Sequence, residues 1–266
     1  MLTTLAGVLG FPVRHSRSPA MMNAAFAELG LDWRYLALPL PPAHFAETVR
    51  ALHGSGYRAA NVTIPHKLAA RELADELSPE AEAIGAVNTL TLDPDGRIRG
   101  DNTDAAGLID ALGEPVPAAA VVLGAGGAAR AAVWALREAG VKDIAVWNRT
   151  ARRATRLAAE LGVQATARPA DAELLVNATS VGLRREDTLD GLPLVDARVV
   201  ADLVYGDLPT PFAHWAEERG ARLVDGLEVL VRQGARSLAI WTGREPPLET
   251  MRRAVVQAAS STSAQV

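Results

Sequence analysis

Lys67 and Asp104 are two residues of this sequence whose side chains could form an ammonium–carboxylate pair for acid–base chemistry. Lys67 follows an apolar run of strand length, residues 59–63, and Asp104 stands directly before a helical pattern that extends to residue 112. An ammonium group can stabilise and protonate an oxygen on which negative charge develops, and a carboxylate can orient the reacting group and return the proton. A lone lysine is more often a surface residue, and Asp104 could simply cap its helix. The pair therefore predicts catalysis only if the strand ends converge.

A glycine-rich turn is the second stretch that could do chemistry. The strand-like run 119–123 is followed at once by Gly-Ala-Gly-Gly-Ala-Ala, then by a helical pattern to about residue 139 and a second strand over 143–147. This G-x-G-x-x-A pattern allows a tight turn and a close approach of a pyrophosphate to the backbone. Free amides at the helix start then face an anion. The residues expected to contact a dinucleotide here are Gly124, Ala125, Gly126, Gly127 and Ala128.

The end of the second strand predicts which dinucleotide is bound. An NAD site usually carries an acid there for the ribose hydroxyls, whereas this chain reads Asn148-Arg149-Thr150, followed by Arg153. A guanidinium holds a 2′-phosphate that a carboxylate would repel, so we expect NADP(H) rather than NAD(H). The arginines at 149, 152, 153 and 156 also have helical spacing, so some of them could form only a solvated helix face.

Two serines on an early loop could bind a carboxylate. Ser16 and Ser18 lie two residues apart, so both hydroxyls can point the same way and donate to one anion. Ser18 also fits the N-cap of a helix over residues 20–29, with Pro19 at its first position. The alternative is a plain cap for Ser18 and a solvated loop residue for Ser16.

The elements that must position these residues alternate between strands and helices. Apolar runs at 5–9, 33–38 and 59–63 are separated by helical patterns, and a turn at 93–96 predicts an antiparallel hairpin. Alternation of this kind indicates an α/β protein with a largely parallel sheet, in which ligands gather beyond the carboxyl ends of the strands.

Composition sets the broad limits. The 266 residues are 49% apolar and 22% charged, with a net charge of −4 and no cysteine. Disulfides and thiolate metal sites are excluded, and the charge does not favour nucleic acid or an anionic membrane. Five scattered histidines without carboxylates at ligand spacing predict that there is no metal site. With no apolar run of membrane-spanning length and no secretory signal pattern, we expect a cytoplasmic protein, either a monomer or a homodimer.

Six short motifs occur together and in order, and together they are specific although each alone is weak. On these motifs the chain resembles the shikimate dehydrogenase family over nearly its full length. The motifs are Ser16-x-Ser18, Asn61 to Lys67, Gly85 to Thr89, Gly100 to Asp104, Gly124 to Ala129 and Asn148 to Thr150.

The resemblance implies a site for a cyclohexene carboxylate. Ser16 and Ser18 would hold the substrate carboxylate, Lys67 and Asp104 would be the catalytic pair, and Asp104 would also meet a ring oxygen. The other residues that the resemblance assigns to substrate are Thr63, Asn88, Tyr205 and Gln233. Those that it assigns to the cofactor, beyond the glycine turn and the 148–153 cluster, are Thr179, Ser180, Leu203, Gly226 and Val229, the last standing where the family often has Met.

The family fold implies two domains with the active site between them. A mixed-sheet substrate-binding domain would comprise residues 1–103, completed by C-terminal helices within 226–258, and a Rossmann-like NADP-binding domain would comprise 104–225. The reaction implied is reversible reduction of 3-dehydroshikimate to shikimate by NADPH, with hydride transfer assisted by Lys67 and Asp104, in the pathway to aromatic amino acids.

Three other functions compete with this one. The first is an NAD-dependent quinate/shikimate dehydrogenase, which a comparison of cofactors and substrates would separate. The second is a Rossmann methyltransferase, which also requires an acid after the second strand, so Arg149 argues against it. The third is a catalytically silent NADPH-binding protein, which would be expected to have lost Lys67 or Asp104.

Overall fold

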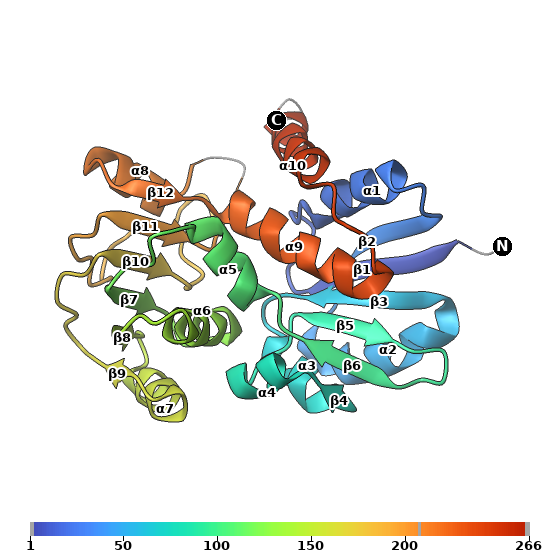
Figure 1. Ribbon diagram of the computed structural model, residues 1–266, viewed down its shortest axis with the longest axis horizontal. Helices are drawn as coiled ribbons and strands as arrows, with labels where there is room; N and C mark the ends of the chain where they lie inside the picture. The colour runs from blue at the N-terminus through green and yellow to red at the C-terminus, as the bar shows by residue number, and fades with distance from the viewer. Residues whose placement is uncertain (1–2, 207–208, 264–266) are drawn as a thin grey trace. The chain divides into compact units, whose positions relative to one another are not determined.

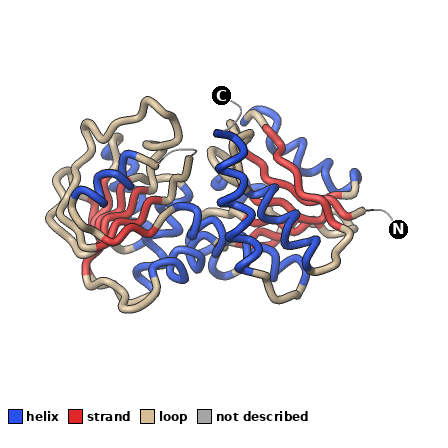
Figure 2. The backbone as a smooth tube through the Cα atoms, turned by 90° about the horizontal axis from the view of Figure 1, so that it is seen from above, coloured by secondary structure: helices blue, strands red, loops and turns tan. Residues whose placement is uncertain are grey.

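The computed structural model describes residues 3–206 and 209–263, and these form two compact units (Figure 1). The first unit comprises the chain up to Thr103 together with the chain from Leu230 onward, and the second runs from Asp104 to Val229. Each unit contains one six-stranded sheet, drawn as red strands in Figure 2. The α/β class predicted from the sequence is confirmed.

The sheet of the first unit is mixed, with the strand order β2-β1-β3-β5-β6-β4. Strands β2, β1 and β3 run parallel, β5 pairs antiparallel with both β3 and β6, and β4 runs parallel to β6. The hairpin expected around residues 93–96 is the β5–β6 connection. The strands are β1 Thr4–Gly10, β2 Trp33–Pro39, β3 Tyr57–Val62, β4 Glu76–Leu77, β5 Thr89–Leu92 and β6 Ile98–Asp101.

Helices cover both faces of this sheet. One face packs its apolar side chains against α2 (Phe45–Leu52), α3 (Lys67–Leu73) and α4 (Pro79–Ile84). On the other, α1 (Ser18–Glu28) lies beside α10 (Leu248–Ser263), as Figure 1 shows, and also approaches α9 (Gly226–Thr242). The α9 backbone comes so close that a Cβ on Gly234 would collide with the Met21 side chain. Short 3₁₀ turns at Pro42–His44 and His53–Ser55 flank α2.

The start of α1 differs from the prediction by one residue. The helix begins at Ser18 with Arg17 in the cap position, and no side chain of the cap residue bonds to the first turn. The Ser18 N–H instead donates to Ser16 Oγ at 3.3 Å. The assignment of Ser18 as N-cap is therefore wrong. The error arises because a proline is tolerated at either of the first helical positions, where the N–H has no partner inside the helix, so Pro19 does not fix the boundary to one residue.

The sheet of the second unit is entirely parallel, with the order β12-β11-β10-β7-β8-β9. The order reverses at β7, between β8 and β10, which is the topological switch point at which open α/β sheets bind ligands. The strands are β7 Ala119–Leu123, β8 Asp143–Trp147, β9 Gln164–Ala165, β10 Leu174–Asn177, β11 Val199–Asp202 and β12 Arg222–Val224.

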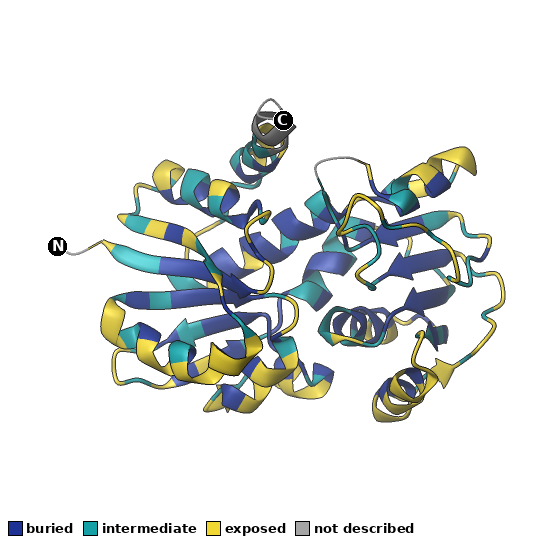
Figure 3. Cartoon of the chain, turned by 180° about the vertical axis from the view of Figure 1, so that it is seen from behind, coloured by how far each residue is buried: buried dark blue, intermediate teal, exposed yellow. Residues whose placement is uncertain are grey.

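Both faces of this parallel sheet are buried. Ala120 and Val122 pack with α5 (Asp104–Leu112), α6 (Gly127–Glu138) and α7 (Ala151–Leu161), while Val121 and Leu123 face α8 (Pro211–Glu218). Burial on two sides explains why β7 reads as a continuous apolar run rather than an alternating one. Figure 3 shows the central strands mostly dark blue and the outer turns of the helices yellow.

Candidate active site

The turn after β7 contains three glycines, and a Cβ added at Gly126 would meet no other atom within 4 Å. Gly124 has φ +118°, and a Cβ there would collide with the Ala178 carbonyl. Gly126 is the cap residue of α6 and offers no side-chain bond to the first turn. Ala129, in that first turn, is fully buried on the inner face of the helix. The first amides of a twelve-residue helix are thus left to an external anion, which the positive end of the helix dipole favours.

Arginines gather beyond β8, and the structure separates them into two groups. Arg156 bonds to Glu160 at 2.7 Å, and the same carboxylate accepts a bond from Arg130 at 2.5 Å. Arg149 and Arg153 are exposed, one in the turn before α7 and the other in its first turn. The helix-face interpretation therefore describes Arg156 well. Of the other predicted residues here, Asn148 donates to the Thr150 carbonyl at 3.0 Å and closes the turn, and Thr150 caps α7 through its backbone alone.

The loop after β10 is held by a buried asparagine. Asn177 Oδ1 accepts from both the N–H and the hydroxyl of Thr179, at 3.1 and 2.7 Å, and its Nδ2 donates to the Val181 carbonyl at 3.1 Å. Thr179 Oγ1 in turn accepts from the Val181 N–H at 3.0 Å. The predicted cofactor residues Thr179 and Ser180 thus lie on a loop of fixed conformation at the carboxyl end of the sheet, next to the strand that carries the glycine turn.

Asp202, at the end of β11, is a buried carboxylate to which the sequence analysis gave no role. Its Oδ1 accepts from Asn177 Nδ2 at 2.8 Å and from the Val204 N–H at 3.0 Å, and its Oδ2 accepts from Thr210 Oγ1 at 2.5 Å. Burial raises the pKa of Asp202 to about 6; the negative charge of Asp225 adds to this, while the three hydrogen bonds oppose it. The carboxylate joins the ends of β10 and β11 to the cap of α8, whose Thr210 also accepts from the Ala213 N–H.

The remaining predicted residues of the second unit follow β11 in the chain. Leu203 and Tyr205 are half-buried in the segment directly after β11. Gly226 opens α9 so close to the segment after β11 that a Cβ would collide with the Val204 carbonyl. Val229, one turn later, is 8% exposed and packs into the apolar core of the unit.

In the first unit, Lys67 begins α3 after a turn, residues 63–66, that follows β3. Its backbone carbonyl accepts from the Val87 N–H at 2.9 Å, and Thr63 closes the preceding turn by accepting from the His66 N–H at 2.9 Å. His66 is buried, contacts the Leu40 carbonyl at 2.7 Å and stacks on Phe45 with the ring centroids 4.4 Å apart. Burial lowers the pKa of His66, which favours the neutral ring. His66 is therefore a packing residue that fixes the turn carrying Lys67.

Asn88 and Gln233, both predicted to bind substrate, belong to one buried hydrogen-bonded cluster. Asn88 Nδ2 donates to Gln233 Oε1 at 3.2 Å and to Thr103 Oγ1 at 3.0 Å. Asn88 Oδ1 accepts from the Thr103 N–H at 2.8 Å and from Thr89 Oγ1 at 3.0 Å. Both ends of the Asn88 amide thus have partners, so its orientation is set by the protein. The other members, Asn61, Ser237 and Tyr35, have no role in the sequence analysis; a polar residue inside an otherwise apolar strand was the available signal for Asn61.

Ser16 and Ser18 lie at the start of α1, and Asp104 lies at the start of α5. Ser18 is 5% exposed, and Ser16 is half-buried. Asp104 is half-buried and opens the second unit, directly after Thr103, the last residue of the first unit's N-terminal segment. The residues before it are fixed by bonds from the Asn102 side chain to the Ala86 carbonyl at 2.9 Å and from Thr103 to Asn88.

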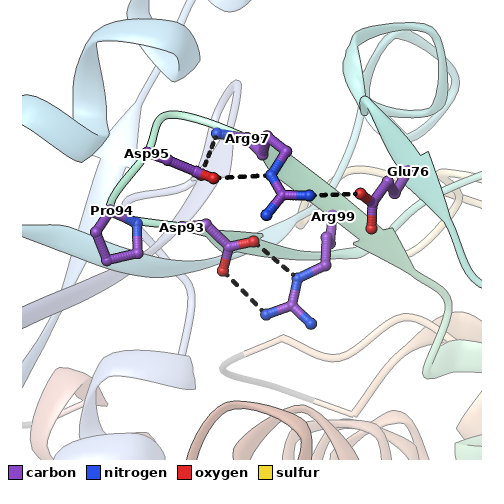
Figure 4. Close-up of a pocket in the computed structure, with 6 residues that line it drawn as sticks. All are labelled: Glu76, Asp93, Pro94, Asp95, Arg97 and Arg99. Atoms are coloured by element: carbon purple, nitrogen blue, oxygen red, sulfur yellow. Dashed lines mark hydrogen bonds and ion pairs between the residues drawn. The ribbon is translucent and has the colours of Figure 1, made fainter.

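A hollow of about 470 Å³ lies at the β5–β6 hairpin, away from these strand ends (Figure 4). Its arginines are already neutralised, because Arg97 pairs with Asp95 and Glu76 and Arg99 pairs with Asp93. None of the predicted site residues lines it. Among the residues that the structure describes, no group of three metal-ligating side chains occurs, and no helix is long and apolar enough to cross a membrane.

Family models match three segments of the chain. Residues 8–90 match the shikimate dehydrogenase substrate binding domain, residues 111–180 match shikimate / quinate 5-dehydrogenase, and residues 226–256 match the shikimate 5′-dehydrogenase C-terminal domain.

Relatives and solved structures agree with these matches. The chain is 45% identical to a shikimate dehydrogenase (NADP(+)) of Methanopyrus kandleri, over 96% of each chain, and 48% identical to one of an Anaeromyxobacter species, over 95% and 96%. A crystal structure of shikimate 5-dehydrogenase from Thermus thermophilus in complex with NADP(H) and shikimate is 42% identical, with a TM-score of 0.85 over 96% of this chain and 99% of that one. The Listeria monocytogenes enzyme, solved with shikimate and NAD, is 32% identical, with a TM-score of 0.79 over 94% and 96%. The chain belongs to the shikimate dehydrogenase family.

Proposed function

We propose that this protein is an NADP-dependent shikimate dehydrogenase that reversibly reduces 3-dehydroshikimate to shikimate, in the formation of aromatic amino acids. One observation carries the choice within the family. A glycine turn with open helix amides lies beside β8, which is followed by Asn148 and exposed Arg149 and has no acid at that end. That combination suits a dinucleotide with a 2′-phosphate.

The residues of the first unit suit the substrate. The Ser16 and Ser18 hydroxyls at the start of α1 would hold its carboxylate, where the helix N-terminus also favours negative charge. Thr63, Asn88 and Gln233 would meet ring oxygens, with Tyr205 and Asp104 from the second unit as further partners. The fixed amide of Asn88 supports this assignment, because a preorganised donor loses little freedom when a hydroxyl binds.

The cofactor residues lie in the second unit. The turn Gly124 to Ala128 would face the pyrophosphate, and Asn148, Arg149, Thr150 and Arg153 the phosphorylated ribose. Thr179, Ser180, Leu203, Gly226 and Val229 would line the nicotinamide end. When bound, NADPH supplies the hydride.

Lys67 and Asp104 would handle the proton. As the carbonyl carbon of 3-dehydroshikimate gains the hydride, the C=O electron pair moves onto oxygen. The Lys67 ammonium would stabilise that charge and donate a proton to it, and in the reverse direction the amine would take the proton back. Asp104 would accept a hydrogen bond from a substrate hydroxyl and so fix the ring relative to Lys67.

An assay of cofactor reduction tests this function directly. Shikimate and quinate would each be offered with NADP⁺ and with NAD⁺, and the absorbance of the reduced nicotinamide followed. We expect the highest kcat/KM with shikimate and NADP⁺. A preference for NAD⁺ or for quinate would favour the quinate/shikimate alternative, and no reduction with any of the four pairs would refute the dehydrogenase assignment. Cytoplasmic location and a monomeric or homodimeric state stay predictions.

A further inference from the structure

Ser237 is a buried hydroxyl on α9, one helical turn after Gln233. Its side chain is fully enclosed, and its Oγ donates to the Gln233 backbone carbonyl at 3.1 Å. The same oxygen accepts from Asn61 Nδ2 at 2.9 Å and lies 2.9 Å from Thr89 Oγ1 and 3.1 Å from Thr103 Oγ1. Ser237 therefore connects residues of three sequence segments to the helix that carries Gln233.

The hydroxyls next to Ser237 are the ones that orient Asn88. Thr89 and Thr103 each contact both Ser237 Oγ and Asn88 Oδ1. Each threonine hydroxyl therefore connects the serine to the asparagine. Each hydroxyl has a single proton, so Ser237 can donate either to the Gln233 carbonyl or to one threonine at a time. A threonine that accepts from Ser237 keeps its own proton for Asn88 Oδ1.

The cluster is anchored in the sheet at its far end. Tyr35 on β2 donates from its hydroxyl to Asn61 Oδ1 at 2.7 Å. This bond turns the Asn61 Nδ2 group toward Ser237, Thr89 Oγ1 and the Asn88 carbonyl. Asn61 is 7% exposed, and a buried amide left without partners costs free energy, so the orientation is strongly preferred.

We propose that Ser237 is a positioning residue for substrate, which acts by fixing the Asn88 amide and the α9 turn that carries Gln233. The inference rests on the proposed function, because Asn88 and Gln233 are the groups assigned to the ring oxygens. It goes further in assigning part of the substrate affinity to a side chain that the surrounding protein encloses completely.

The Ser237→Ala variant tests this directly. We expect KM for shikimate to rise on the order of 10-fold, the usual worth of one hydrogen bond, with the Kd for NADPH within twofold of the wild-type value. A thermal melt reports folding, and NADPH fluorescence reports cofactor binding. An unchanged KM for shikimate in a folded variant would overturn the proposal, as would an equal loss of NADPH binding.

A matched control lies on the same helix. Thr242 Oγ1 donates to the carbonyl four residues earlier, Leu238, at 2.8 Å, the same kind of back-bond that Ser237 makes to Gln233. Among the described residues, Thr242 bonds to Leu238 and Arg244 and not to the cluster around Asn88, so Thr242→Ala should leave KM for shikimate unchanged. A rise equal to that of Ser237→Ala would mean that a general weakening of α9, and not the cluster, causes the effect.

A double-mutant cycle separates positioning from direct contact. If Ser237 acts through Asn88, then Ser237→Ala should add little to the loss caused by Asn88→Ala, because the group being positioned is already gone. Full additivity would overturn the proposal. If Ser237→Ala does not fold, Tyr35→Phe removes the far hydroxyl without changing shape, and a KM for shikimate raised about 2- to 5-fold is expected, whereas an unchanged KM would refute the relay. Wild-type activity on shikimate tests the proposed function separately, so the two failures are distinguishable.

Discussion

The two units fix their functional loops with different chemistry. In the first unit, the hydrogen bonds described around Asn88 join amide and hydroxyl groups. In the second, the loops after β10 and β11 meet at one buried carboxylate, Asp202, which accepts three hydrogen bonds.

This difference in chemistry predicts how the hydrogen bonds of each unit respond to pH. A neutral cluster keeps the same hydrogen bonds across the physiological pH range, which suits the proposed contact of Asn88 with an uncharged ring hydroxyl. A buried carboxylate makes stronger bonds than a neutral acceptor, but it carries a desolvation cost and can take up a proton. The hydrogen bonds around Asn88 in the first unit should therefore not change with pH. Those around Asp202 in the second unit should change when the carboxylate takes up a proton.

The largest effect on activity should come from replacing Lys67. This change tests whether a residue of the first unit is needed for turnover. Lys67→Ala should lower kcat about 10²- to 10⁴-fold, the usual loss on removing a positioned acid. Steady-state kinetics with saturating shikimate and NADP⁺ measure it. Arg71→Ala removes an exposed cation from the same helix and should leave kcat intact. Retention of near wild-type turnover in Lys67→Ala would remove the central residue of the proposed mechanism.

The next effect concerns Asp202 and the pH dependence of stability. Its pKa is raised in the folded protein to about 6 from the ordinary 3.8. Between these values the folded state binds more protons than the unfolded state, so this group's stabilising contribution is fully present below about pH 4 and is lost as pH rises through 6. The shift corresponds to about 3 kcal/mol in the free energy of unfolding.

Asp202→Asn should remove that slope. The amide keeps an oxygen for Asn177 and Val204, and its nitrogen can donate to Thr210 Oγ1, so the fold should persist. Urea unfolding at several pH values from 4 to 7 measures the slope, and Asp190→Asn, at an exposed carboxylate, serves as the control. An identical slope in wild type and Asp202→Asn would show that the buried carboxylate does not titrate as described.

A smaller effect should follow from replacing Arg149. This change tests whether the second unit binds the 2′-phosphate of the cofactor. Arg149→Asp removes a charge-assisted bond to a 2′-phosphate and adds repulsion, so kcat/KM for NADP⁺ should fall about 10- to 100-fold, with NAD⁺ gaining in relative terms. KM for shikimate should hardly change. Arg156→Ala is the matched control, because Arg156 is engaged by Glu160. An equal loss with both cofactors in Arg149→Asp would count against the phosphate role.

The sequence predicted the local structures whose signals lie within one short segment. The glycine turn, the arginine after β8 and the hairpin of β5 and β6 each depend on residues within one short segment, and steric rules fix what such segments do. Two short strands, β4 and β9, were missed because two-residue pairings leave no periodic pattern. The start of α1 was misplaced by one residue because a proline is compatible with either of two helix boundaries.

The supporting residues could not be predicted in this way. The hydrogen bond between Asn61 and Ser237 joins positions 176 residues apart. No local pattern in either segment predicts that the two side chains meet. Asp202 sits after an apolar run, as many exposed strand-end acids do, and only the packing of α8 and the neighbouring loop buries it. Tertiary contacts, and not local propensity, give these residues their partners.

Titration of NADPH into the Lys67→Ala and Arg149→Asp variants tests the central claim, that Lys67 of the first unit supplies the proton chemistry and Arg149 of the second unit binds the phosphorylated dinucleotide. We predict that Lys67→Ala binds NADPH with the wild-type Kd while turning over slowly, and that Arg149→Asp binds NADPH weakly yet approaches wild-type kcat at saturation. Loss of NADPH binding in Lys67→Ala, equal to its loss of turnover, would contradict that division.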